Sequence, residues 1–398
     1  MDNLGTKKRI KSRRESHRAS ACDMRRRAKD GAKRRGKPPK VLDRSEGKRS
    51  EPHNFVPDAG PGCVIAHGVG VEWALGSEKI DPRDYDRDAV FPDLAVDPET
   101  GTLSVVNATN TSRVAYVTVY DHPVLKRDGT QHPVGRTVDS NRTERHCTTF
   151  ILLLPPRIIL HAGTLTSPSS EIDSDVQDWR EHPEPEDEHC QTLGFPLEGQ
   201  EPYLCTQGEG GSLTHFFSGN LHAIDFRCPV GTELIAVADA TVMEVSDTET
   251  CTGVATANLF KWNSVMLKIL NETDGSGEES IDGEPNQNNP KSPETKGGDL
   301  FVEYVHIKTG SVCVAVGDVV KKGQKICESG SVGFSPEPHL HFTAFRSRDK
   351  TAATTRVRFL SEGGDDNENE KVDKPFLPIA GRWYDKSGEV PQPVSCDT

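Results

Sequence analysis

Short runs of β-branched and aromatic residues, separated by polar turns, dominate the first half of the chain. Four such runs lie at residues 103–107, 114–120, 148–154 and 157–161. Runs of this length and composition predict β-strands, and the proline pair between the last two marks a break rather than a continuous strand. Their spacing predicts a small β-sandwich-like domain over residues 55–166. Its role is open, because no residue pattern in it points to catalysis.

Strand-like runs resume at residue 190 and continue to about residue 360. Residues 271–299 interrupt them with a stretch rich in Gly, Asn, Pro, Glu and Asp, which predicts a disordered surface insertion. Residues 167–189 hold nine acidic residues and one arginine, so we expect an extended linker there. Residues 361–398 predict a polar C-terminal tail. The pattern therefore predicts a mostly β protein with a second, antiparallel β-sheet domain over residues 190–360.

Within this second domain, three glycines stand where hairpin turns are expected. Gly231, Gly317 and Gly323 each separate two apolar runs. Tight hairpin turns often need a backbone with positive φ, which glycine adopts without steric cost. We therefore predict structural roles for all three.

The composition supports a strand-and-turn protein rather than a helical bundle. Hydrophobic residues make up 33% and aromatic residues 6% of the 398 residues, beside 35 Gly and 27 Pro. The most apolar stretch, residues 150–160, is broken by Pro155, Pro156 and Arg157, so no membrane span is predicted. Met1 leads into a basic polar run without the apolar core of a secretory signal.

Charge divides the chain into two parts. Residues 1–50 contain 19 of the 48 Lys and Arg but only 6 of the 61 Asp and Glu, so the rest of the chain is strongly acidic. Residues 1–54 are predicted to be a disordered basic tail, and its presence in the mature protein is open. A nuclear-import or nucleic-acid role is the alternative. Nucleic acid is not the expected partner, because the acidic remainder repels phosphates and no aromatic residues interleave the basic ones.

Cysteines and glycosylation sequons bear on the cellular compartment. The ten cysteines include no Cys-x-x-Cys pair, which argues against a zinc ribbon, and their even number fits disulfides. Cys313 with Cys327 and Cys190 with Cys205 are the candidate pairs. Four sequons begin in segments expected to be exposed, at Asn107, Asn110, Asn141 and Asn271. These features favour an extracellular protein and the missing signal sequence argues against one, so localisation stays open.

Three segments of the second half carry histidine or aspartate in an alternating context. In a strand, His339 and His341 would share one face while the intervening Leu340 faces the core. Two exposed strand histidines would give the same pattern, so this motif alone does not define a metal site. Asp225 stands between two apolar residues and needs a cation or metal if it is buried. Alternation also predicts that Tyr304 and His306 share a face.

In order along the chain, residues 207–215, 223–236, 304–307, 316–326 and 330–342 resemble the lysostaphin-type zinc endopeptidases. The similarity spans about residues 207–345 and implies a β-sheet domain related to the duplicated hybrid motif. The family hydrolyses peptide bonds in bacterial cell-wall peptides. The resemblance therefore implies a zinc metalloendopeptidase with one Zn²⁺ per chain and a peptide or peptidoglycan substrate.

The resemblance implies metal ligands at His215, Asp225 and His341, with His306 and His339 as catalytic residues. Three protein ligands leave the fourth tetrahedral position open for water, as in catalytic zinc sites. The first ligand has an alternative in His222. Because three residues separate His222 from Asp225, the two side chains would face opposite sides of a continuous strand, which favours His215. A β-bulge at Ala223 would reverse that argument.

Two functions from different classes fit this pattern. The first is a zinc-dependent metallopeptidase. The second is a catalytically inactive binding module on the same fold that recognises a protein or glycan partner. Inactive members usually lose one of the two catalytic histidines, and this chain keeps both His306 and His339. The sequence leaves the cleaved bond, the oligomeric state and the activity of the site open.

Overall fold

Residues Glu51–Thr398 form one compact unit. The structure is a computed structural model, and it describes residues 62–65, 69–76, 78–79, 93–167, 169–178, 190–199, 202–216, 219–270, 298–349, 352–362 and 374–393. The basic tail and the insertion at 271–297 lie outside these residues.

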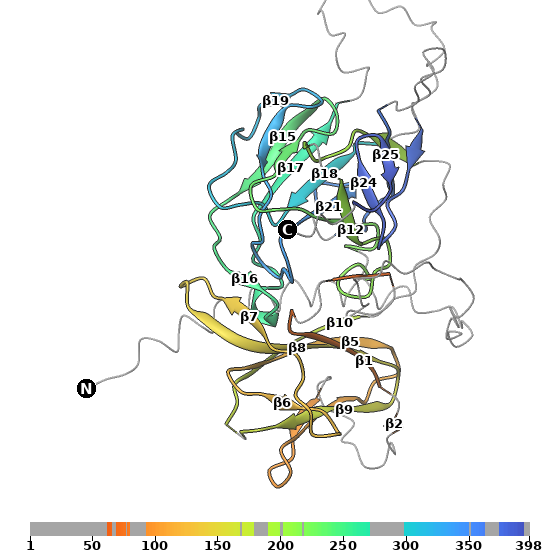
Figure 1. Cartoon of the computed structure of the whole chain (residues 1–398). Coiled ribbons are helices and arrows are strands. Elements are labelled where there is room, and N and C mark those ends of the chain that lie inside the picture. The colour runs from red at the N-terminus through yellow and green to blue at the C-terminus, as the bar shows by residue number, and fades with distance from the viewer. Residues whose placement is uncertain are drawn as a thin grey trace, which may run out of the picture. The chain divides into compact units, whose positions relative to one another are not determined.

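The regular secondary structure of the described residues is almost entirely β-strand, as the sequence predicts (Figure 1). In this part of the chain the single helix is a short 3-10 turn, η2 (Thr256–Asn258). None of the described helices is long and apolar enough to cross a membrane.

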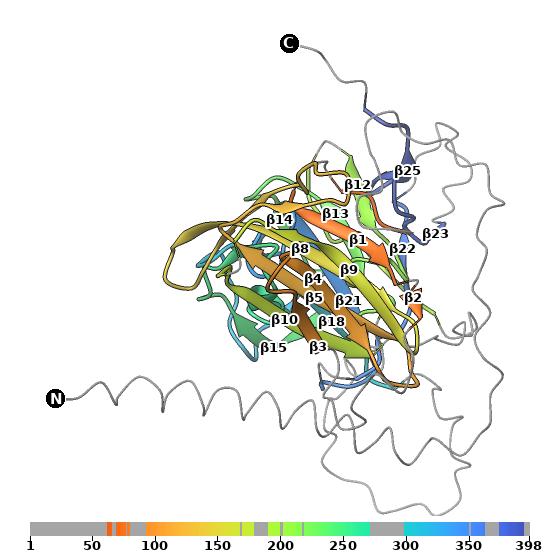
Figure 2. The same cartoon turned by 90° about the horizontal axis from the view of Figure 1, so that it is seen from below.

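Two sheets form the predicted N-terminal sandwich. One contains β1 (Val71–Leu75), β5 (Arg113–Tyr120), β7 (Gly135–Val138), β8 (Glu144–Leu154) and β10 (Ile172–Asp178), together with β16 (Thr252–Gly253) from the second half of the chain. The other contains β2 (Glu78–Lys79), β3 (Asp93–Val96), β4 (Thr102–Asn107), β6 (Val124–Leu125) and β9 (Ile158–Leu165). Figure 2 shows β4, β5, β8 and β9 running alongside one another, as in aligned sandwiches. Buried side chains such as Val105, Val117 and Phe150 fill the space between the sheets.

The sandwich extends into the segment predicted to be a linker. Strand β10 pairs antiparallel with β5 along its whole length. Two of the acidic residues that suggested a self-repelling linker have partners: Tyr120 donates a hydrogen bond to Asp173, and Arg145 forms an ion pair with Glu171. The linker prediction is therefore wrong for residues 172–178, because they form a strand that pairs with β5 in the sandwich.

A nine-stranded sheet forms the second domain, in the order β19-β15-β17-β18-β21-β13-β12-β24-β25. These strands span Val319–Val320, Ala240–Ser246, Ser264–Ile269, Phe301–Val305, His339–Phe345, Ile224–Arg227, Tyr203–Gln207, Trp383–Asp385 and Gly388–Val390, respectively. Two small sheets accompany it: β14 (Glu233–Ile235) with β20 (Lys325–Glu328), and β11 (Gln191–Leu193) with β22 (Val357–Leu360) and β23 (Pro375–Phe376).

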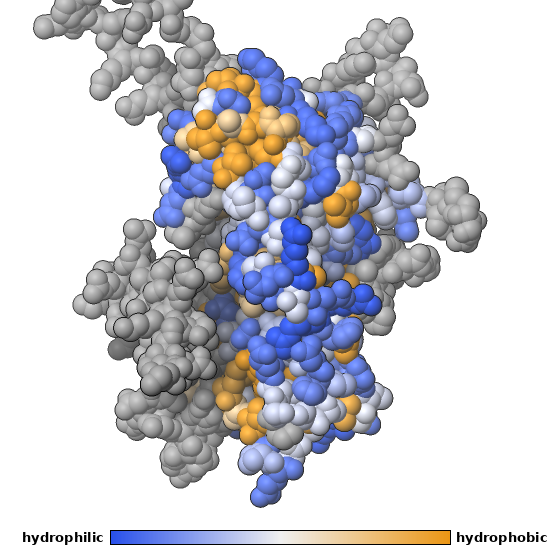
Figure 3. All heavy atoms as spheres, turned by 90° about the vertical axis from the view of Figure 1, so that its left-hand side faces the viewer, coloured by the Kyte–Doolittle hydropathy of each residue, from blue (hydrophilic) through white to orange (hydrophobic). Residues whose placement is uncertain are grey.

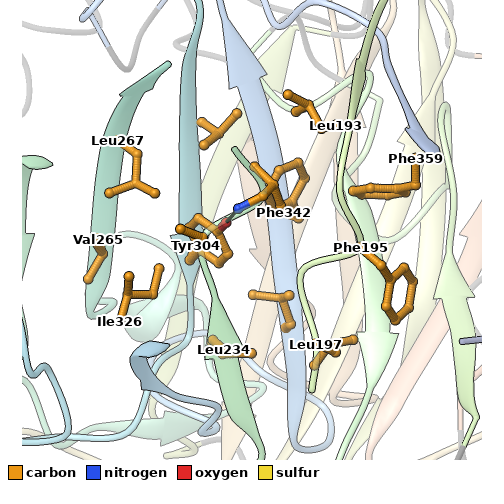
Figure 4. Close-up of a cluster of buried hydrophobic side chains, with 14 of the residues drawn as sticks. Leu193, Phe195, Leu197, Leu234, Val265, Leu267, Tyr304, Ile326, Phe342 and Phe359 are labelled. Atoms are coloured by element: carbon orange, nitrogen blue, oxygen red, sulfur yellow. Dashed lines mark hydrogen bonds between the residues drawn. The ribbon is translucent and has the colours of Figure 1, made fainter. Parts of the chain in front are cut away.

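The core of this domain lies between the large sheet and the small ones (Figure 4). Phe342 and Tyr304 project from β21 and β18 toward Leu234 of β14 and Phe359 of β22. The Tyr304 hydroxyl donates a hydrogen bond to the Ile235 carbonyl and accepts one from the Val237 N–H. This buried phenol is therefore fully paired, which a polar group in a core requires.

The predicted polar tail is part of the sheet. Strand β24 pairs with β12, and β25 pairs with β24. The Tyr384 ring is buried against Phe226 and stacks on Phe376. The tail prediction is wrong for residues 374–393, because β24 pairs with β12 and Tyr384 packs into the core of the domain.

The three predicted turn glycines have the expected backbone. Gly231, Gly317 and Gly323 adopt φ angles of 95°, 96° and 82°, which lie in the left-handed region. Their structural role is confirmed.

Neither proposed disulfide is formed. Cys313, Cys327 and Cys205 are free thiols, and Cys313 is exposed whereas the other two are buried. The segments of Cys313 and Cys327 do lie side by side, since the Cys313 N–H donates to the Ile326 carbonyl. The sequence therefore predicted correctly that these two segments lie side by side, but it did not predict correctly that their cysteines form a disulfide.

One sequon is structural rather than exposed. Asn107 is fully buried, and its amide nitrogen donates hydrogen bonds to the carbonyls of Thr111, Leu154 and Pro155. Its side-chain oxygen accepts from the Thr109 N–H, as in an Asx turn. Asn110 and Asn141 are exposed as predicted, and Asn271 lies outside the described residues.

The sandwich and the second domain share a hydrophobic cluster and a strand pair. Strand β16 pairs antiparallel with β7. Tyr116 of β5 packs against both Phe216 and Phe334, with ring centroids 6.2 and 5.9 Å away. The sandwich therefore contacts two loops of the second domain, at Phe216 and at Phe334.

A patch of hydrophobic side chains lies on the surface of the second domain. Figure 3 shows it in the upper part of the view, on the side where β15 and β19 lie in Figure 1. Val316 and Val319, at this edge of the sheet, are 62% and 60% exposed.

Candidate metal centre

Residues of the candidate site come from the neighbouring strands β13 and β21 and from the residue that follows β18. Asp225 of β13 lies directly opposite His341 of β21, and Arg227 lies opposite His339. Opposed residues in a sheet point to the same face, at close range. Leu340 and Phe342 point the other way into the core, so the predicted alternation of β21 is confirmed.

His215 reaches the sheet from the loop that follows β12. Its ring is fully buried, and its Nε2 atom lies 3.2 Å from Asp225 Oδ1 and 3.2 Å from His341 Nδ1. The third separation, from His341 Nδ1 to Asp225 Oδ1, is 2.7 Å. Among the described residues these three make the one group that could hold a metal ion.

The donor set and spacing fit zinc. Two imidazole nitrogens and a carboxylate oxygen are typical of a catalytic zinc site, with metal–ligand distances of about 2.0–2.2 Å. A tetrahedral centre with such bonds separates its ligand atoms by about 3.4 Å. The observed separations of 2.7–3.2 Å are close to this value, so small side-chain shifts would open the triangle enough to coordinate the ion.

Backbone carbonyls fix which nitrogen of each imidazole is available. The Nδ1 atoms of His215, His306 and His339 lie 3.0, 2.6 and 2.7 Å from the carbonyl oxygens of Gly208, Val332 and Glu337. Because a carbonyl only accepts, each Nδ1 must carry a proton. The Nε2 lone pair is then free in the neutral ring, for a metal or a proton.

His306 enters the site through an unusual backbone. Strand β18 ends at Val305, and His306 follows with φ 62°, in the left-handed region. The ring centroid of His306 lies 4.6 Å from that of His339 and 5.7 Å from that of His341. The expectation that Tyr304 and His306 share a face is wrong, because alternation stops at this residue. Strained conformations of this kind concentrate at functional sites.

His222 takes no part in the cluster. Its side chain is buried beside Thr354, where Nδ1 contacts the backbone carbonyl and the hydroxyl of that residue. This position accords with the parity argument that favoured His215.

The charges around Asp225 suit a metal ligand. Burial would raise the pKa of this carboxyl, but the neighbouring His215, His339 and His341 outweigh it and hold the pKa well below its usual range. Burial lowers the pKa of His215, and burial with the two nearby imidazoles lowers that of His306 well below its usual range. At neutral pH the site therefore presents the Asp225 carboxylate and the neutral imidazoles of His215 and His306, and a carboxylate and a neutral imidazole are the protonation states that bind metal.

Sequence reasoning missed Gln207 and Ser335. Gln207 Nε2 donates to Asp225 Oδ2 at 2.8 Å, and Ser335 Oγ lies 3.3 Å from His339 Nδ1. A β-bulge in β12 places Gln207 rather than Thr206 opposite Asp225. No residue in the sequence marks that bulge. Glu337 forms an ion pair with Arg227 at the end of the same strands.

A buried His–Asp–His triad beside two further histidines, on an antiparallel sheet, is typical of a zinc metallopeptidase. Residues 294–353 match the model of Peptidase family M23, and the chain carries a lysostaphin-type domain of this zinc metallopeptidase family. The comparison with curated protein sequences finds no match.

Several solved structures of peptidases are similar to the chain. The catalytic domain of a mutant of the prophage-encoded M23 protein EnpA from Enterococcus faecalis is 20% identical, over 41% of this chain and 94% of that one, with a TM-score of 0.26. The catalytic domain of the antimicrobial peptidase lysostaphin from Staphylococcus simulans is 23% identical, over 39% and 86%, with a TM-score of 0.23. A zinc-containing peptidase from Vibrio cholerae is 18% identical, over 47% and 41%, with a TM-score of 0.23.

Proposed function

We propose that this protein is a zinc-dependent endopeptidase that hydrolyses peptide bonds in cell-wall cross-link peptides. The observation that carries the proposal is the arrangement of five side chains. Three place donor atoms within 4.8 Å of one another, and two further imidazoles stand beside them with Nε2 unprotonated in the neutral ring. An inactive binding module would not need the two further imidazoles.

His215 Nε2, Asp225 Oδ1 and His341 Nδ1 would hold the ion. When bound, zinc lowers the pKa of a water molecule toward 7 and polarises the scissile carbonyl. Asp225 brings one negative charge, which offsets half of the charge of the ion. The Gly208 carbonyl keeps the His215 ring turned so that Nε2 faces the other two donor atoms.

His306 and His339 would accept the proton of the attacking water and donate it later. Each has Nδ1 fixed by a backbone carbonyl, so Nε2 is the atom that can accept a proton from the attacking water. The low pKa of His306 keeps it neutral, and therefore able to act as a base, at neutral pH. Once protonated, an imidazole here can donate a hydrogen bond to the oxyanion of the tetrahedral intermediate or to the leaving amine.

The substrate class is tested with purified, cross-linked peptidoglycan. Incubation with the zinc-loaded, full-length protein should release new amino groups and soluble fragments. The His339→Ala variant and a chelator-treated sample should release neither. If the wild-type protein binds zinc and peptidoglycan but cleaves nothing, the binding-module function is correct instead.

A further inference from the structure

A single buried glutamine contacts both the loop of the first metal ligand and the carboxylate of the second. Gln207 ends β12 and is 1% exposed. Its Oε1 atom accepts hydrogen bonds from the backbone N–H groups of Leu213 and Thr214 at 3.0 and 2.9 Å, and from that of His215 at 3.4 Å. The loop that carries His215 is therefore wrapped around one side-chain oxygen.

The other half of the same amide holds Asp225. Gln207 Nε2 donates to Asp225 Oδ2 at 2.8 Å and to the Thr214 hydroxyl at 3.0 Å. This bond leaves Oδ1 as the carboxylate oxygen that faces His215 and His341. An ordered partner on the second oxygen fixes the rotation of the carboxylate, as outer-shell groups do in metal sites.

The surroundings of Gln207 are also fixed. The Val64 N–H donates to the Thr206 carbonyl at 2.6 Å, and Cys63 forms an isolated bridge with Gln207. On the loop, the Leu213 carbonyl accepts a hydrogen bond from Tyr116 Oη of the sandwich at 2.5 Å. Gly211 leaves room for the amide, because a Cβ atom there would lie 2.3 Å from Gln207 Cγ.

We infer that Gln207 is a positioning residue for the metal centre. It fixes the His215 loop and the Asp225 carboxylate in one geometry, so the protein binds zinc without first ordering its ligands. The inference rests on the proposed zinc site. It concerns metal affinity rather than contact with substrate.

The test measures the zinc dissociation constant of the full-length protein by competition with a chromophoric chelator. Gln207→Ala and Gln207→Met should each weaken zinc binding by about 10–100-fold, the usual effect of losing an outer-shell partner. Met keeps the length of the side chain, so this variant retains the packing if Ala disturbs the fold. The thermal unfolding of the metal-free proteins is recorded alongside.

Asn258→Ala is the matched control. Asn258 is also a buried amide, whose nitrogen donates to Thr137 Oγ1 and to the Thr252 carbonyl, away from the metal ligands. Its loss should lower the melting temperature and leave the zinc dissociation constant unchanged. Equal zinc affinity in wild type and Gln207→Met, or an equal loss in Asn258→Ala, would overturn the inference. Absence of zinc from the wild type would instead refute the proposed function.

Discussion

At the scale of single residues, the hydrogen bond made by Nδ1 of an imidazole determines whether Nε2 is available to bind a metal or a proton. His306 and His339 donate through Nδ1 to the Val332 and Glu337 carbonyls, and neither belongs to the metal triangle. We therefore propose that these two imidazoles move protons, whereas His215, Asp225 and His341 hold zinc. Substitution distinguishes these two roles.

His306→Ala and His339→Ala should each keep one zinc per chain and lower kcat by about 100-fold or more, because general acid–base groups contribute that much. His341→Ala should lose tight zinc binding, because two ligands remain. Zinc content and initial rates are measured on the same preparations. If either of the first two variants lost its metal, the division of roles would be incorrect.

The choice of His215 over His222 has its own test. His215→Ala should abolish tight zinc binding, since its Nε2 faces Asp225 and His341. His222→Ala should retain zinc and lose only stability, because this ring is buried against Thr354. Equilibrium dialysis with zinc compares the two variants. Retention by His215→Ala together with loss by His222→Ala would reverse the assignment.

Cysteine reactivity follows burial. Burial raises the pKa of Cys147 and Cys228 to about 11, and Cys205 and Cys327 are also buried. We expect iodoacetamide at pH 8 to label exposed Cys313 in the native protein and these four only after denaturation. Peptide mapping by mass spectrometry reads out each site. Rapid native labelling of Cys228 would contradict the packing of β13 and β21.

At the scale of elements, alternation predicted the strands well and their ends poorly. The segments expected at residues 103–107, 114–120 and 148–154 are strands, and β21 presents its histidines and its core residues as alternation requires. The left-handed turn at His306 and the bulge beside Gln207 depend on tertiary contacts, so no local pattern reveals them.

The same limit explains the C-terminal strands. A short segment with few apolar residues and many charged ones gives no local sign of being a strand. It becomes one here because β24 pairs with β12, which lies about 180 residues earlier. Long-range pairing of this kind is not encoded in any short window. The pairing of β24 with β12 nevertheless helps to position β12, the strand that ends at Gln207.

Tyr384 should contribute strongly to the stability of this sheet. Its ring is 1% exposed and packs on Phe226 and Phe376. Tyr384→Ala should lower the free energy of unfolding by about 3 kcal/mol or more, as aromatic deletions in cores do. Urea denaturation measures the change. Phe260→Ala, at a ring that is 54% exposed, is the control and should change it by less than about 0.5 kcal/mol.

At the scale of the whole molecule, the protonation of the site is linked to stability. Burial lowers the pKa of His215 and His306 in the folded protein. The unfolded chain therefore binds protons below about pH 6.5 that the folded chain does not, and folding weakens as the pH falls. Asp225 acts in the same direction at lower pH, because its folded pKa is depressed.

Metal-free protein should accordingly lose melting temperature as the pH is lowered from 7.5 through about 6.5, the ordinary pKa of histidine. His306→Gln lacks one of these groups and should show a shallower fall. Differential scanning calorimetry with a chelator present measures both. A flat profile, or identical slopes for the two proteins, would show that these imidazoles are not held neutral by burial.

The central claim is that His215, Asp225 and His341 form a zinc site. Elemental analysis of the full-length protein, purified without chelators and dialysed against zinc, tests it most directly. We expect about one zinc per chain in the wild type and much less than one in His341→Ala. A wild-type protein that retains no zinc after this treatment would contradict the claim and remove the basis for the proposed peptidase.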